Sequence, residues 1–247
     1  MSTVTAVPDA REPRETASAA QGGPPPGVVA AVFAGLFVAG VVLTAVLAGG
    51  SPFPSPYGET GPIVTWFRDH AGAVRIGATL QFAAALPLTV YTATVTARLQ
   101  RLGVRAPGTF IALGGGLLAA GLLIGSALAS LLLTRAEVLA DPGLVRTVQY
   151  LAFLTGGPGH VAPLGLLVAG LAVPGLLAGL LPRRFAYAGL AVAFVAQLTV
   201  LALLVEGAAV LLPLARFPGL IWLVAAGFLL PRSRPRTRTG ARAGTQE

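Results

Sequence analysis

The sequence predicts an all-α fold, a polytopic membrane helix bundle with six transmembrane helices and an outer interfacial helix. The first observation is compositional, because 55% of the 247 residues are hydrophobic and only 11% are charged. About a quarter of the residues in soluble domains are charged. The second observation is that six stretches hold roughly 18 or more residues with few charges, enough to cross a ~30 Å hydrocarbon core. The third is that the basic residues, all arginine, lie mostly in short segments between these stretches, as in membrane proteins.

The chain begins with a polar segment, residues 1–27, that is rich in Ala, Pro and Gly and ends in "GGPPPG". This segment has little to bury and is expected to be disordered. Its charges nearly cancel, and the apolar stretch after it is longer than the hydrophobic region of a signal peptide. We therefore expect a cytoplasmic tail followed by a membrane anchor.

Six spans make up the predicted transmembrane domain, residues 28–231. The predicted spans are 28–48, 71–97, 109–133, 159–181, 185–205 and 213–230. The sixth span begins where Pro213, Arg216 and Pro218 lie close together. Because proline is tolerated in the first turn of a helix, we place these residues at the entrance of the span.

Residues 143–155, "GLVRTVQYLAFLT", form a further helical pattern before the fourth span. Leu144, Val148, Leu151 and Leu154 recur at helical intervals. The segment is too short to cross a membrane. It is either an interfacial helix or an extension of the fourth span.

Arginine is distributed unequally between the two sides of the predicted membrane domain. Twelve of the 17 arginines fall on the side that carries both termini, and five fall on the other side. The excess of arginine marks the cytoplasmic side. We expect a multi-pass protein of a bacterial inner membrane with both termini in the cytoplasm.

The C-terminal segment, residues 232–247, carries five arginines directly after the sixth span and is too polar to fold alone. It is either an anchor that fixes the topology or a segment that docks on anionic lipids, which attract a basic residue by about 1 kcal/mol near the surface. The formal net charge of +8 would also suit nucleic acid. Since the arginines lie between apolar spans, we expect the lipid bilayer as partner and no nucleic acid. The oligomeric state stays open.

Polar side chains gather, by depth, in the outer half of the predicted bundle. They are Arg75, Gln81, His160, Gln197, Glu206 and Arg216. A polar group inside a bilayer is costly and needs a partner. These residues predict either an outward-facing site for a small ligand or lipid headgroup, or an ion pair with a Gln–Gln contact between helices.

His160 follows "GGPG", residues 156–159, where an interfacial segment could turn into the fourth span. One interpretation is a histidine at the wet outer end of a span, in contact with headgroups or a backbone carbonyl. The other is a broken helix that lines a cavity, since irregular backbone at membrane depth needs protein or water around it.

No catalytic or metal-binding constellation is present in the sequence. The chain has no cysteine and only two histidines, far apart, so disulfide, zinc and haem sites are not expected. Ser126 shares its depth with no histidine, and the "GGG" at residues 114–116 follows no strand. We predict a non-enzymatic protein without a cofactor that binds a ligand or senses the state of the envelope. The alternative is a small transporter or channel.

Small residues at four-residue spacing predict close helix packing within the chain. Gly121, Gly125 and Ala129 share one face of the third span, and Gly175 and Gly179 share one face of the fourth.

Four stretches resemble a bacterial family of small six-span integral membrane proteins of unknown function. They are "VVAAVFAGLFVAG" at 28–40, "LQFAAALPLTVYTATVTARLQRLG" at 80–103, "LLPRRFAYAGLAV" at 180–192 and "LPLARFPGLIWLVAAGFLLPR" at 212–232. The resemblance covers residues 28–231 and implies the six-span architecture. Arginine without lysine, with abundant Ala and Gly, suggests an actinobacterial source.

Overall fold

The computed structural model describes residues 23–231, which form an α-helical bundle. Six helices are long and apolar enough to cross a membrane, which confirms the predicted fold class. The predicted tails fall largely outside the described residues, which exclude 1–22 and 232–247. The elements are α1 (Pro26–Leu47), α2 (Thr60–Asp69), α3 (Ala71–Arg101), α4 (Gly108–Leu132), α5 (Ala136–Leu139), α6 (Pro142–Gly156), α7 (Pro158–Leu177), α8 (Arg183–Leu198), η1 (Thr199–Leu203), η2 (Glu206–Val210) and α9 (Leu211–Leu229).

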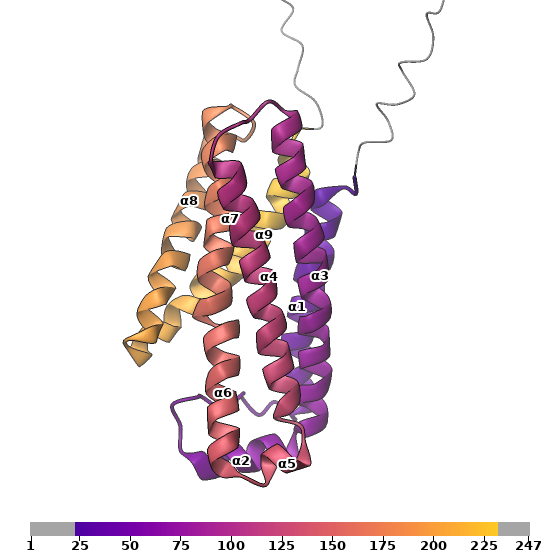
Figure 1. The fold of residues 1–247 in the computed structure, drawn as a ribbon, viewed down its shortest axis with the longest axis vertical. Helices are drawn as coiled ribbons and strands as arrows, with labels where there is room; N and C mark the ends of the chain where they lie inside the picture. Colours follow the sequence, from indigo (N-terminus) through magenta and orange to yellow (C-terminus); the bar gives the residue numbers. More distant parts are fainter. Residues whose placement is uncertain (1–22, 232–247) are drawn as a thin grey trace, which may run out of the picture.

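The bundle has two distinct ends (Figure 1). At one end, which we call the terminal end, α1 begins and α9 finishes side by side. A Cβ at Gly227 would lie 2.7 Å from the Gly27 Cα, so the two helices touch there through their backbones. At the other end, which we call the α2 end, α2 and α5 lie across the bundle.

Helices α6 and α7 follow one another along a shared axis (Figure 1). Backbone hydrogen bonds continue through the junction, from Gly157 N to Phe153 O at 2.6 Å and from Val161 N to Gly157 O at 2.9 Å. Residues 143–155 are therefore an extension of the fourth span, the second of the two interpretations. The combined helix holds 36 residues and is about 54 Å long at 1.5 Å per residue. The short amphipathic helix that lies across the bundle is instead α2, which buries Ile63, Val64 and Phe67.

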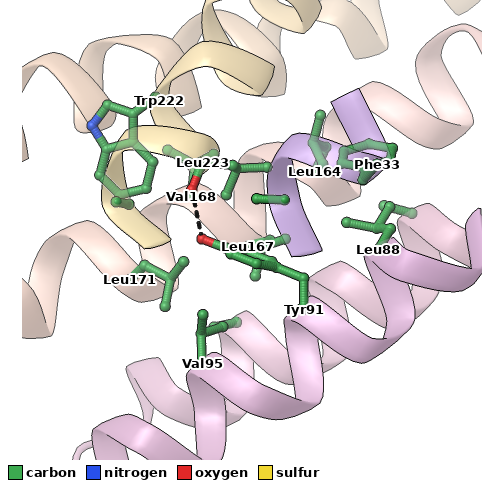
Figure 2. Close-up of a cluster of buried hydrophobic side chains, with 14 of the residues drawn as sticks. Phe33, Leu88, Tyr91, Val95, Leu164, Leu167, Val168, Leu171, Trp222 and Leu223 are labelled. Atoms are coloured by element: carbon green, nitrogen blue, oxygen red, sulfur yellow. Dashed lines mark hydrogen bonds between the residues drawn. The ribbon is translucent and has the colours of Figure 1, made fainter. Parts of the chain in front are cut away.

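The core at the terminal end is close-packed around Tyr91 of α3 (Figure 2). The Tyr91 hydroxyl donates to the Leu223 carbonyl of α9 at 3.0 Å. Leu88, Leu167 and Leu171 belong to the same buried cluster, and each has 0% of its surface exposed. This satisfied hydroxyl ties α3 to α9 within an apolar core.

Helices α4 and α7 approach closely at glycines other than those predicted. A Cβ at Gly115 would lie 2.7 Å from Pro163 O, and a Cβ at Gly170 would lie 2.6 Å from Gly108 O. The predicted packing faces are only partly found. A Cβ at Gly121 or Gly179 would meet nothing within 4 Å, whereas a Cβ at Gly175 would lie 2.6 Å from the Leu181 side chain. On α4, Ala129 is buried, and a Cβ at Gly125 would reach only Thr155 of α6, at 4.0 Å. Two glycines of the "GGG" motif are therefore packing positions of α4: Gly115 faces α7, and Gly116 faces Thr92 of α3.

The hairpin formed by α8, η1, η2 and α9 is shorter than the α6–α7 column beside it (Figure 1). Its tip lies beside the middle of that column, since Gln197 Nε2 donates to Ala162 O at 2.9 Å. At the same level, Leu212 of α9 would lie 3.3 Å from a Cβ at Gly157. Because α9 begins at this level, the space between α1 and α6 toward the α2 end contains no part of α9.

Candidate functional site

A cavity of about 420 Å³ lies among α1, α3, α4, α6 and the start of α9. Its volume is within the range of about 300–1,000 Å³ that is typical of ligand sites. Helix α9 contributes only Leu212 and Arg216, from its first two turns. The cavity thus lies on the α2 side of the point where α9 begins.

Most of the described lining residues are apolar, and a few polar side chains converge among them. The polar ones are Thr44, Ser51, Trp66, Gln81, Ser126, Ser130, Gln149 and Arg216. An apolar wall with few polar groups is the usual character of a small-molecule site. Val41 and Ala45 of α1 line the cavity and are also exposed, so the cavity opens beside α1.

Residues 51–58, which we call the strap, run across the cavity from α1 toward α6. Ser51, Phe53, Pro54 and Pro56 of the strap line it. Proline has no N–H to satisfy, so this segment can lie on an apolar surface at little cost in hydrogen bonds.

Side chains of α6 hold the far part of the strap. Gln149 Nε2 donates to Pro54 O at 3.1 Å, and Arg146 donates to Gly58 O at 2.5 Å. The Tyr57 ring contacts the Tyr150 ring edge-on, with centroids 6.3 Å apart. Desolvation raises the pKa of the Tyr57 hydroxyl, and the charge of nearby Glu206 raises it further.

Side chains of α2 hold the near part of the strap. Trp66 Nε1 donates to Ser51 Oγ at 2.9 Å. The Phe53 ring packs edge-on against Trp66 and Phe67, with centroids 5.1 Å and 5.5 Å away. The strap is therefore fixed at both ends to neighbouring helices.

Phe37 lines the cavity and also belongs to the buried apolar cluster around Tyr91, so it lies at the boundary between the two. Its ring stacks on the His160 ring, with centroids 6.2 Å apart and an angle of 13° between planes. The Arg216 guanidinium carbon lies 5.4 Å from the Phe37 centroid, a cation–π distance. His160 itself does not line the cavity and has no exposed surface.

Three buried polar atoms near this cavity have no hydrogen-bond partner among the described residues: Gln149 Oε1, His160 Nε2 and Arg216 Nε. Gln149 and Arg216 line the cavity directly. Such atoms are uncommon in native proteins, and each costs about 1–3 kcal/mol if nothing satisfies it. Two of the three atoms thus lie at the cavity, where a molecule that occupies it can satisfy them.

The structure brings three of the six predicted site residues together. Gln81 and Arg216 line the cavity, and His160 lies behind Phe37. Arg216 donates to Gly156 O inside the bundle instead of facing the membrane surface.

The other three predicted residues do not converge on the cavity. Arg75 and Glu206 are exposed on α3 and η2. Gln197 donates to Ala162 O rather than to Gln81, so the predicted Gln–Gln contact is not formed. None of these three residues lines the cavity.

Neither of the two interpretations of His160 holds in full. It contacts a backbone carbonyl, as the first allowed, but it is not at the wet end of a span, since none of its surface is exposed, and it does not line the cavity, as the second required. His160 Nδ1 lies 2.9 Å from Ala119 O, near the middle of α4. The cause is α6, which extends the helix beyond the glycines and places His160 in its interior.

Phe37, Gln149 and the strap line the cavity although they were not among the predicted site residues, and Ser126 has a packing role rather than that of a nucleophile. Ser126 Oγ donates to Ala152 O at 2.8 Å, which ties α4 to α6. A Cβ at Gly156 would collide with the Ser126 side chain. The Pro-rich composition of residues 51–56 was the available signal for an ordered segment over an apolar surface.

No cluster of three metal-ligating side chains occurs within residues 23–231. Comparison with protein-family models, curated proteins and solved structures finds no match for this chain. The function is therefore inferred from the geometry of the cavity.

Removing both α6 side chains that hold the strap is expected to loosen it. In the variant Arg146→Ala with Gln149→Ala, amide hydrogen exchange in residues 51–58 should accelerate by about 30-fold, since two hydrogen bonds to the strap of ~1 kcal/mol each are lost. Exchange in α6 itself should stay unchanged. Thr147→Ala is the control, because Thr147 bonds only Gly143 O of its own helix. Equal exchange in the double variant and the control would contradict this role for α6.

Proposed function

We propose that this protein is a non-enzymatic, multi-pass protein of a bacterial cell membrane that binds a small amphipathic molecule in the cavity beneath the strap. The observation that carries the proposal is the apolar cavity with two unpaired buried polar atoms, Gln149 Oε1 and Arg216 Nε. An apolar wall suits a hydrocarbon part, and the unpaired atoms suit a polar head.

The distribution of arginine supports an orientation with both termini in the cytoplasm. In this orientation the α2 end, and the cavity with it, lies toward the outer side. The opening beside Val41 and Ala45 of α1 then faces the lipid bilayer. An amphipathic molecule could enter from the bilayer without first dissolving in water.

The chemistry of the lining supports binding rather than catalysis. Ser126 donates its proton to a backbone carbonyl, and His160 lies outside the lining. None of the described lining residues is acidic. A nucleophile with an adjacent base, which covalent catalysis requires, is not assembled among these residues.

Transport is the second candidate, because the cavity reaches Gln81 near the middle of α3. Beyond Phe37, however, Leu88, Tyr91 and Leu223 are fully buried in a packed core. A channel needs a continuous path through this region. The blind cavity favours binding over conduction.

Filling the cavity from α4 tests the proposal. Ser130 lines the cavity and is partly buried, so Ser130→Phe should remove saturable binding of radiolabelled dodecanoate and dodecanol. The full-length chain would be measured in phosphatidylcholine nanodiscs, with empty nanodiscs as background. Leu128→Phe is the matched control, since Leu128 is 48% exposed on the same helix.

The expected result is saturable binding to wild type and Leu128→Phe and none to Ser130→Phe. Equal elution of the three proteins in size-exclusion chromatography would show that they are folded alike. Binding to Ser130→Phe at the wild-type level, or no saturable binding to wild type, would make the proposed function wrong.

A further inference from the structure

The charge of the cavity is set by one residue. Arg216 is the only charged side chain among the described lining residues. One of its terminal nitrogens donates to Gly156 O, and its guanidinium lies over the Phe37 ring. Its Nε–H is buried and has no partner among the described residues.

The groups around Arg216 compensate its charge only in part. A carbonyl and an aromatic ring are both neutral, and they offset less of the cost of a buried cation than an anion does. A guanidinium offers five N–H donors in a planar fork that fits the oxygens of a carboxylate or phosphate. The site therefore has positive charge and donor capacity that the described residues leave unused.

We infer that the molecule bound in the cavity is an anionic amphiphile whose carboxylate or phosphate head contacts Arg216. This inference rests on the proposed function and names its ligand class. The hydrocarbon part lies against the apolar wall formed by Val74, Leu123 and Leu133. The volume of about 420 Å³ is near the lower limit of ligand sites, which favours one alkyl chain over two.

The same lining is less favourable for cationic and uncharged heads. An ammonium group would meet Arg216 as a like charge and find no carboxylate among the described lining residues. Gln81 and Gln149 offer neutral amide groups only. An uncharged alcohol would fill the apolar part and leave the charge of Arg216 without an anion.

Four probes with the same alkyl chain test the inference: dodecanoate, dodecyl phosphate, dodecanol and dodecyltrimethylammonium. Each is titrated into the full-length chain in phosphatidylcholine nanodiscs, with empty nanodiscs as background. We expect at least one anion to bind wild type about tenfold more tightly than dodecanol, the value of one charge-assisted hydrogen bond. We expect dodecyltrimethylammonium to bind more weakly than dodecanol. The two anions distinguish a carboxylate from a phosphate as the preferred head.

Arg216→Gln should abolish the preference for the anion over dodecanol, because the fixed positive charge of the lining is lost. Arg216→Lys should keep part of the preference, because it retains the charge without the planar fork. Arg75→Gln is the control for the general charge of the protein, since Arg75 is exposed on α3. It should bind all four probes as wild type does.

The outcomes separate the inference from the proposed function. Equal binding of dodecanol and both anions by wild type, with loss of all three in Ser130→Phe, would overturn the inference and leave the proposed function intact. A preference for anions that persists in Arg216→Gln would also overturn it. No saturable binding of any probe to wild type would overturn both. If Arg216→Gln does not fold, the preference for an anion over dodecanol in wild type and in Arg216→Lys still tests the inference.

Discussion

Gly115→Leu is expected to lower the free energy of unfolding by about 3 kcal/mol or more, the upper part of the range for overpacked cores. The new Cβ would lie 2.7 Å from both Pro163 O and Leu167 N of α7. These are backbone atoms, so relief requires α7 to move away from α4. That movement would also disturb the contact of Gly170 with Gly108 along the same interface. Thermal unfolding in detergent, followed by circular dichroism, measures the effect.

The adjacent glycine provides the control. A Cβ at Gly114 would meet nothing within 4 Å, and the residue is exposed. Gly114→Leu adds the same side chain to the same helix and replaces glycine with a better helix former, which favours the helix by up to ~1 kcal/mol. It should unfold at the wild-type temperature or above. Equal destabilisation by the two variants would show that helix propensity, rather than the close approach of α7, governs this part of α4.

The spans could be predicted from the sequence because length and charge are enough to define them. The direction in which each helix faces could not be predicted in the same way. On α4, exposed Leu117 and Leu118 are as apolar as buried Leu123, because the outside of a membrane bundle is as hydrophobic as its core. For the same reason, hydropathy does not distinguish Gly115, which packs against α7, from Gly114 and Gly121, which do not.

The candidate site was predicted in part because polar residues in apolar helices are few. Gln81, His160 and Arg216 stood out for that reason, and they lie in or beside the cavity. The predicted depths of His160 and Arg216 were wrong, because the helices that carry them begin at levels that the sequence did not predict. Glycine and proline at residues 156–159 predicted a helix end, yet the backbone continues with one irregular residue, Gly157. Helix α9 begins beside the middle of the bundle, which brings Arg216 inward.

Phe37→Ala is expected to lower the free energy of unfolding by about 3–5 kcal/mol and to open the cavity toward His160. Phe37 is 2% exposed, lines the cavity and stacks on the His160 ring. With its side chain removed, the unpaired His160 Nε2 gains access to whatever fills the cavity. The chain has two histidines, so a His70→Gln background leaves His160 as the one histidine that diethylpyrocarbonate can modify, and its carbethoxylation is followed by peptide mass spectrometry. Modification should be slow in that background and fast once Phe37→Ala is added.

Phe33→Ala separates loss of core packing from opening of the cavity. Phe33 lies one helical turn from Phe37, is 1% exposed and belongs to the same core cluster, but it does not line the cavity. Its replacement should destabilise the bundle by a similar amount, since the same side chain is lost from the same helix. His160 should nevertheless stay protected, because the Phe37 ring still covers it. If Phe33→Ala exposes His160 as fast as Phe37→Ala does, general loosening of the bundle is the cause, and Phe37 does not form the boundary between the cavity and the core.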